Sequence, residues 1–337
     1  MLRKANIWLV FLAILIIAGV MLYVMSPKKQ AEYPVELTIG IATWPGFASG
    51  IIGMEKGLFD RIDLEHRILD DAPARHAAFQ SGDIDIMISS LDVFAQEAAQ
   101  GIKGKIFLIT DESFGGDGIV ARPEIKTPAD LKDKKVAFAL ATPSHFLLYK
   151  VLEKNGLSPS DIQQIKVDDP GHAAHAFLGG SVDAAVTWEP FLTEVKEKGK
   201  GHVLLTTRDY PGIIVDVLVA SKKLSQNSEL LCRFINGWLR SVEYIKQHPD
   251  ESSKIIARGL NIKGEDVKRM MSGLRFADWS RNAEFFNARK PLKTKIAKIL
   301  KEAAEFWKSQ GIIAKMPSVN DLISTTATEY FSSKGKH

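Results

Sequence analysis

The chain has 337 residues, enough for one large or two medium-sized domains with a proper hydrophobic core. It carries 44 Lys and Arg against 40 Asp and Glu, and the excess comes from residues 1–30, which hold four basic and no acidic side chains. The rest of the chain is therefore neutral overall, which argues against a nucleic-acid partner because such proteins present a basic surface.

The chain begins with an apolar run that predicts export. Residues 7–25 contain no charged side chain and are long enough to cross a bilayer as a helix. Basic residues flank the run on both sides, so charge does not decide its orientation. The absence of a small-residue cleavage site favours an uncleaved signal anchor over a cleaved signal peptide in residues 1–30. We expect a periplasmic or extracytoplasmic protein anchored to the cytoplasmic membrane by residues 7–25.

Strands and helices alternate through the first part of the body. Short apolar runs indicate strands, and longer amphipathic stretches indicate helices. Trp44-Pro-Gly forms a turn after the first strand. The predicted strands are 36–42, 64–69, 84–88 and 106–110, and the predicted helices are 51–59, 74–80 and 91–100. This spacing is typical of parallel βαβ units.

The alternation continues after a polar loop at residues 111–118. Strands are expected at 119–121, 135–140, 165–167, 184–187 and 203–205, with helices at 146–155 and 191–198. Residues 213–220 return the chain, and helices follow at 230–248, 249–259, 264–274 and 292–310. We predict an α/β fold with two lobes, one formed by 36–120 with 217–330 and the other by 121–216. Two lobes joined by two crossings form a hinge, and hinges close on ligands.

One pattern occurs twice. Residues 80–92 (QSGDIDIMISSLD) align with residues 178–190 (LGGSVDAAVTWEP), with Asp85 matching Asp183. In both, a small-residue turn leads to a short buried strand, a polar tip and a helix. Either each lobe offers such a tip to a shared cleft, or the likeness is one that any two βα units have. Ligands of open α/β sheets bind at the carboxyl ends of the strands, which favours the first interpretation.

Several short motifs, in their order and spacing, resemble those of the nitrate/sulfonate/taurine and thiamine-precursor class of ABC-transporter substrate-binding proteins. Each is weak alone, but together they extend from about residue 37 to 248. The motifs are 44–46 (WPG), 55–59 (EKGLF), 80–85 (QSGDID), 118–121 (GIVA), 130–136 (DLKDKKV), 152–157 (LEKNGL) and 182–190 (VDAAVTWEP).

The resemblance implies a bilobed periplasmic-binding-protein fold. Members of the class capture a small solute between two lobes and deliver it to a membrane permease. We therefore expect a binding protein without enzymatic activity or cofactor. It would bind a small nitrogen- or sulfur-containing organic solute, have an ABC permease as its partner, and be a monomer.

Aromatic and hydroxyl side chains at the predicted strand tips are candidates for contact with the solute. Trp44 and Trp188 come from opposite lobes and could stack on the two faces of a flat or apolar solute, or serve as packing aromatics. The hydroxyl candidates lie at the starts of helices, where they could also act as helix caps. They are Ser89 and Ser90 in the first lobe and Thr142 and Ser144 in the second, followed by His145, which could face the cleft.

The acidic residues give the clearest indication of the charge and hydrogen-bonding groups of the solute. Glu189, Asp117 and Asp216 fall at strand tips or at the crossings between lobes, and no lysine or arginine occupies these tips. A sulfonate or nitrate site is expected to hold a fixed cation, whereas acceptors alone suit N–H donors or positive charge. We therefore expect an amine, an amidine or an aminopyrimidine. Glu189 would accept its hydrogen bonds beside Trp188, unless it merely caps the following helix.

Two other functions stay open from the sequence. An enzyme could use the same fold, because fold does not fix function. His172 and His175 lie one helical turn apart, but no third ligand follows at a suggestive spacing, so no metal site is expected. Cys232, the only cysteine, is expected to be a buried core thiol. A membrane-anchored sensory ectodomain is the other alternative.

Overall fold

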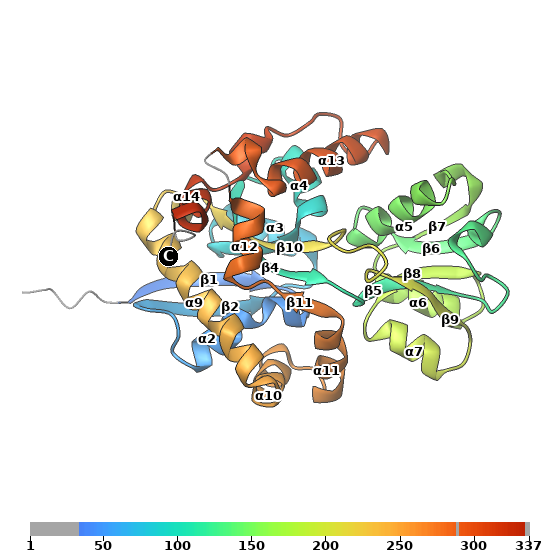
Figure 1. The fold of residues 1–337 in the computed structure, drawn as a ribbon, viewed down its shortest axis with the longest axis horizontal. Coiled ribbons are helices and arrows are strands. Elements are labelled where there is room, and N and C mark those ends of the chain that lie inside the picture. The colour runs from blue at the N-terminus through green and yellow to red at the C-terminus, as the bar shows by residue number, and fades with distance from the viewer. Residues whose placement is uncertain (1–33, 288–289, 334–337) are drawn as a thin grey trace, which may run out of the picture. The chain divides into compact units, whose positions relative to one another are not determined.

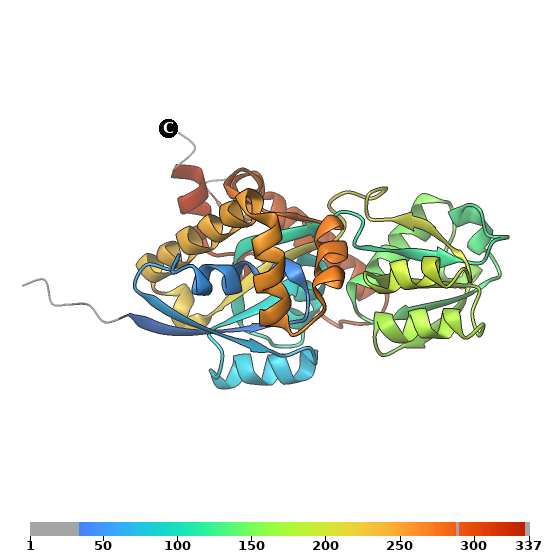
Figure 2. The same cartoon turned by 90° about the horizontal axis from the view of Figure 1, so that it is seen from below.

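The structure is a computed structural model that describes residues 34–287 and 290–333. The chain divides into two units, residues 1–35 and 36–337, and the fold reported below is that of the second. Its described residues form two β-sheets with helices packed around them, shown from two directions in Figures 1 and 2. The predicted α/β class with two lobes is confirmed.

The first sheet combines strands from both ends of the chain, in the order β11-β4-β10-β3-β1-β2. Strand β1 runs parallel to β3, whereas β10 runs antiparallel to both β3 and β4. The parallel βαβ arrangement predicted from the spacing is found for β1 and β3, whereas β10, which returns from the second lobe, joins the sheet antiparallel. The strands are β1 (Val35–Ile41), β2 (Ile62–Ile68), β3 (Ile86–Ser90), β4 (Gly104–Ser113), β10 (Val215–Ser221) and β11 (Leu274–Phe276).

The second sheet has the order β7-β6-β8-β5-β9. Strand β6 is parallel to β7 and β8, and β5 is antiparallel to β8 and β9. Its strands are β5 (Asp117–Ala121), β6 (Lys135–Ala139), β7 (Gln163–Val167), β8 (Ala184–Trp188) and β9 (His202–Thr206). Alternate residues of its central strands enter two separate hydrophobic clusters, with Phe138 in one and Ala137 in the other. Both faces are covered, which explains the continuous apolar runs of β6 and β8.

The chain passes between the sheets twice, from β4 to β5 and from β9 to β10. Figure 1 shows β4 and β10 side by side, with β4 leading toward the second lobe and β10 leading back from it. Both crossings fall a few residues earlier than the predicted boundaries at 120/121 and 216/217. Asp117 already pairs with β8, and Val215 already pairs with β4, because each strand begins directly after its connecting loop.

Helices of the C-terminal part complete the first lobe. Helix α13 (Lys295–Ser309) packs on α4 (Leu91–Ala99), where the Trp307 indole N–H donates to the carbonyl of Asp92 over 2.7 Å. Helix α9 (Ser228–Gln247) is amphipathic, and its Cys232 is half-buried against the core. The other α-helices are α2 (Ser49–Glu55), α3 (Ala72–Ser81), α5 (Pro143–Lys154), α6 (Pro170–Leu178), α7 (Phe191–Glu197), α8 (Lys222–Ser225), α10 (Pro249–Leu260), α11 (Gly264–Ser272), α12 (Trp279–Phe286) and α14 (Thr325–Ser333).

One predicted helix, 264–274, is shorter than expected. Helix α11 ends at Ser272 with Gly273 as its cap, and Leu274 begins strand β11 at the edge of the first sheet. Pairing with β4 satisfies backbone groups of that edge strand, an interaction that local periodicity does not reveal.

None of the helices within residues 34–287 and 290–333 is long and apolar enough to span a membrane. The anchor predicted at residues 7–25 lies outside the described residues.

Gly273 offers a test of the close packing at the first crossing. A Cβ added to it would lie 2.7 Å from the Gly116 Cα, and backbone atoms cannot move aside as a flexible side chain can. We expect Gly273→Ala to lower the free energy of unfolding by about 1–3 kcal/mol, the usual cost of overpacking. Chemical denaturation would measure this.

Gly264→Ala at the other end of α11 is the control, because a Cβ there meets no atom within 4 Å. It should be neutral or slightly stabilising, since alanine favours helix. Equal stability of the two variants would contradict the packing described at Gly273.

Candidate functional site at the junction of the lobes

Four strands of the first sheet place side chains in one row at the edge facing the second lobe. The last residue of β3, Ser90, pairs with Asp216 at the start of β10. Asp216 pairs in turn with Asp111 near the end of β4, and Asp111 pairs with Phe276 of β11. The row collects polar residues that are far apart in sequence.

Trp44 lies over this row, in the turn that follows β1. Its indole N–H donates to Asp111 Oδ2 over 3.1 Å, and the Thr110 hydroxyl donates to Asp111 Oδ1 over 3.0 Å. Gly46 permits this approach, because a Cβ there would lie 1.9 Å from Asp111 Oδ1. The turn predicted at Trp44-Pro-Gly therefore brings an aromatic ring and a carboxylate together.

The second lobe contributes Trp188 and Asp117, which pair in register at the ends of β8 and β5. The rings of Trp44 and Trp188 contact each other, with centroids 6.2 Å apart and planes inclined by 25°. The two predicted aromatics thus meet from opposite lobes. A flat solute between them would need about 7 Å, two carbon–carbon contacts, so it would have to separate the rings.

Four buried aspartates act on one another at this junction: Asp92, Asp111, Asp117 and Asp216 are only 1, 0, 4 and 9% exposed. Burial raises the pKa of Asp92 and of Asp111 to about 7 and that of Asp117 to about 6. Burial, followed by repulsion from the other three, raises the pKa of Asp216 well above its usual range. Because Asp117 belongs to the second sheet, the cluster draws on both lobes.

The hydroxyl candidates of the first lobe differ in their partners. Ser89 donates to Glu97 over 2.7 Å, and Glu97 also binds His76, so Ser89 is held within the lobe. Ser90 is buried, and its hydroxyl has no hydrogen bond of normal geometry. Both carboxylate oxygens of Asp92 are likewise buried and lack such a bond within the described residues, although the Ser90 hydroxyl and the first backbone N–H groups of α4 lie near enough to favour its ionised form.

The candidates on α5 have structural contacts. Thr142 precedes the helix and donates its hydroxyl to the Ala139 carbonyl, and Ser144 is buried. His145 accepts the Ala141 N–H at Nδ1. Its ring contacts Phe138, Tyr149, Phe306 and Trp307, and burial lowers its pKa to about 4. His145 therefore lies in an aromatic cluster rather than among the aspartates.

Glu189 serves as a helix cap. Its two carboxylate oxygens accept from the backbone N–H and the hydroxyl of Thr193, over 3.1 and 2.9 Å. These bonds match the alternative role named for it above. Contact of Glu189 with a solute stays a prediction.

Sequence reasoning missed Asp92 and Asp111. Asp92 stands in the first turn of α4, at the position that aligns with Pro190 in the repeated pattern. Asp111 directly follows the predicted strand 106–110, so its place at a strand tip was a usable signal. Their burial and proximity depend on non-local strand pairing, which no local pattern contains.

The two histidines considered above as metal ligands, His172 and His175, make separate contacts in the structure. His172 Nδ1 lies 2.7 Å from Asp169 Oδ2, and His175 packs edge-on against Phe191. In the described part of the chain, no three His, Cys, Asp or Glu side chains are grouped so that they could hold a metal ion.

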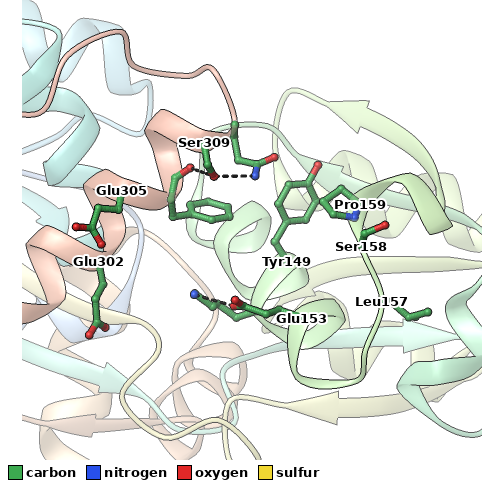
Figure 3. A pocket seen from close by; sticks show the side chains of 11 residues that line it. Tyr149, Glu153, Leu157, Ser158, Pro159, Glu302, Glu305 and Ser309 are labelled. Carbon is green, nitrogen blue, oxygen red and sulfur yellow. Dashed lines mark hydrogen bonds and ion pairs between the residues drawn. The ribbon is translucent and has the colours of Figure 1, made fainter.

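A groove of about 510 Å³ lies elsewhere, between α5 and α13. Figure 3 shows Tyr149, Ser158 and Pro159 on one side of it and Glu302, Glu305 and Ser309 on the other. None of the four aspartates lines this groove. The volume of this groove therefore does not locate the candidate site. The buried polar groups at the junction of the lobes indicate it better.

Comparisons with known proteins show what this chain is similar to. A model of a family described as NMT1/THI5 like matches residues 44–252, more than half of the chain. The taurine-binding periplasmic protein of Escherichia coli is 24% identical over 280 residues, 80% of this chain and 83% of that protein.

Two solved structures share the fold. The periplasmic aliphatic sulphonate binding protein SsuA of Escherichia coli superposes with a TM-score of 0.72 at 20% identity, covering 88% of this chain and 99% of SsuA. The desulfurization enzyme DSZB superposes with a TM-score of 0.63 at 14% identity, covering 90% of this chain and all of DSZB. The fold therefore occurs in a binding protein and in an enzyme.

The aspartate cluster predicts that stability falls as pH rises. Between the ordinary aspartate pKa of about 4 and the raised values near 7, the folded chain binds more protons than the unfolded chain. Its stabilising contribution is complete below about pH 4 and is lost as pH rises through 7. We expect the free energy of unfolding, without solute, to fall from pH 5 to pH 8 by on the order of 2 kcal/mol for each aspartate whose pKa is near 7.

Denaturation at several pH values would measure this slope, and Asp92→Asn should flatten it. Asp85→Asn is the matched control, because Asp85 accepts the Thr38 N–H at the opposite edge of the same sheet. Stability that is constant or rises over this range would show that the aspartates are ionised without penalty.

Proposed function

Because the chain belongs to the NMT1/THI5-like family, we propose that it is the solute-binding component of an ABC import system. It captures a small nitrogen- or sulfur-containing organic solute between its lobes and delivers the solute to a membrane permease. The observation that carries the proposal is the junction itself. Buried polar groups and a pair of tryptophans converge there from two sheets joined by two crossings. Names of similar proteins, which include taurine- and sulphonate-binding ones, support the same class.

The lobes proposed to close on the solute are residues 36–120 with 217–330 and residues 121–216, adjusted at the crossings to the strand pairing. Closure would act on Trp44 and Trp188, Ser90, and the aspartates from both lobes. We propose that the protein is a monomer without cofactor.

Trp188 gives a direct test of this site. We expect Trp188→Ala to weaken solute binding at least tenfold, since a lost aromatic stack removes about 1.5 kcal/mol or more. Stability should change little, because 36% of the side chain is exposed. The solute is first identified by mass spectrometry of small molecules released from purified protein, and its affinity is then measured by calorimetric titration.

Leu292→Ala is the control, since Leu292 is a large apolar side chain that is 60% exposed. Unchanged affinity in the Trp188 variant would remove Trp188 from the site.

The second part of the proposal concerns location. Residues 7–25 would anchor the protein, with the body on the outer face of the cytoplasmic membrane. Protease added to spheroplasts should then digest the body, and the protein should stay with membranes after alkaline extraction. Protection of the body would contradict the orientation, and a mature N-terminus near Lys28 would contradict the anchor.

The second candidate function is that of an enzyme. The raised pKa values of the buried aspartates are the observation that favours it. Carboxyl groups with pKa near 6 to 7 can exchange protons at neutral pH, as general acids and bases do. A released solute that remains chemically unchanged after incubation with fresh protein would support binding alone. Turnover of that solute would support the enzyme.

A further inference from the structure

The buried aspartates indicate the charge of the solute, an inference that rests on the proposed function. Asp92, Asp111, Asp117 and Asp216 are within electrostatic reach of one another, as the repulsion acting on Asp216 from the other three shows. No ion pair joins any of them to a lysine, arginine or histidine among residues 34–287 and 290–333. Buried charges normally have partners, so this cluster lacks a positive one.

A second observation points into the same place. The Ser90 hydroxyl and both oxygens of Asp92 are more than nine-tenths buried and make no hydrogen bond of normal geometry. Ser90 pairs with Asp216 across the sheet, and its hydroxyl interacts with Asp92. Three buried polar atoms at the end of β3 and the start of α4 are therefore available to accept hydrogen bonds from a ligand, since within the described residues only the Ser90 hydroxyl and the first backbone N–H groups of α4 act on Asp92.

Arginines that border the site are engaged elsewhere. Arg281 pairs with Glu112, and Arg208 and Arg275 lie over the ring of Phe114. Arg208 also donates to the Ser272 carbonyl. An anionic head group placed among the four aspartates would meet repulsion without a facing cation.

We propose that the solute is a small organic cation, a protonated amine or amidine, whose N–H groups donate to Asp92, Asp216 and the Ser90 hydroxyl. Asp117 then approaches from the second lobe as the lobes close. An amidinium offers two parallel N–H groups that fit a carboxylate, and such charge-assisted bonds are stronger than neutral ones. Trp44 and Trp188 provide aromatic faces that attract a cation.

The experiment uses two matched sets of probes with the full chain. The aromatic set is benzamidine, benzamide and benzenesulfonate, and the aliphatic set is butylamine, butanamide and butanesulfonate. Each set keeps one frame and changes the head group from cation to neutral to anion. Thermal shift and calorimetric titration measure binding, with magnesium and calcium chloride as further arms.

We expect a cation in at least one set to bind at least tenfold more tightly than its neutral and anionic counterparts. Asp92→Asn and Asp216→Asn should each weaken that cation by tenfold to a hundredfold while leaving the neutral probe unchanged. Ser90→Ala, which removes a hydrogen-bond acceptor without changing charge, should weaken binding of that cation several-fold. Asp85→Asn removes a charge at the far edge of the sheet and should leave the affinity unchanged. Circular dichroism confirms that each variant is folded.

The remaining outcomes separate the two proposals. Preferential binding of a sulfonate, or of a divalent metal ion alone, would overturn the cationic class and leave solute binding intact. A cation whose affinity is the same in the Asp92 and Asp216 variants would overturn the assigned residues. If no probe binds and mass spectrometry finds no anion, cation or neutral solute released from the protein, the proposed binding function itself fails.

Discussion

Strand β4 leads out of the first lobe and strand β10 leads back into it, and the two pair antiparallel along almost their whole length. This pairing fixes the edge of the first sheet that faces the second lobe. Asp111 and Asp216 become neighbours only because of it, and β3 adds Ser90 to the row. The pairing also brings both crossings together, so the second lobe is attached at one edge of the first sheet.

Because of this strand pairing, several aspartate carboxyl groups lie close together in a buried region. Carboxylates in such a place either take up protons or find positive partners. The raised pKa values correspond to the first response. Residues kept in such an unfavourable arrangement are typical of functional sites, where stability is given up for binding.

Contacts outside the site also join the lobes. Helix α13 packs on α4 of the first lobe, and its Phe306 and Trp307 contact His145 on α5 of the second. The Gln96 side-chain amide of α4 donates to the Ala141 carbonyl at the start of α5. A hinge motion that opens the site would have to change these contacts. The aromatic cluster around His145 thus joins α5 to α13, and contact of His145 with a solute stays a prediction.

Local patterns in the sequence determined much of this protein. Apolar runs located most strands, and the turn chemistry placed Trp44 and Trp188 at strand tips, where the structure brings them into contact. These features depend on neighbours a few residues away, which a sequence displays directly. Periodicity failed at Leu274, where an edge strand replaces the last turn of a helix, because the reason lies in a distant strand.

Only the tertiary structure decided the composition of the site. In the sequence, nothing indicates that Asp92 and Asp111 are buried. Strand pairing in the fold buries them near Asp216. A carboxyl pKa depends on burial and on nearby charge, both of which are non-local. Glu189, in contrast, stood at a promising tip, yet a local hydrogen bond to Thr193 engages its carboxylate. The sequence alone therefore located the strand ends, and long-range pairing of β3, β10 and β4 decided which side chains meet there.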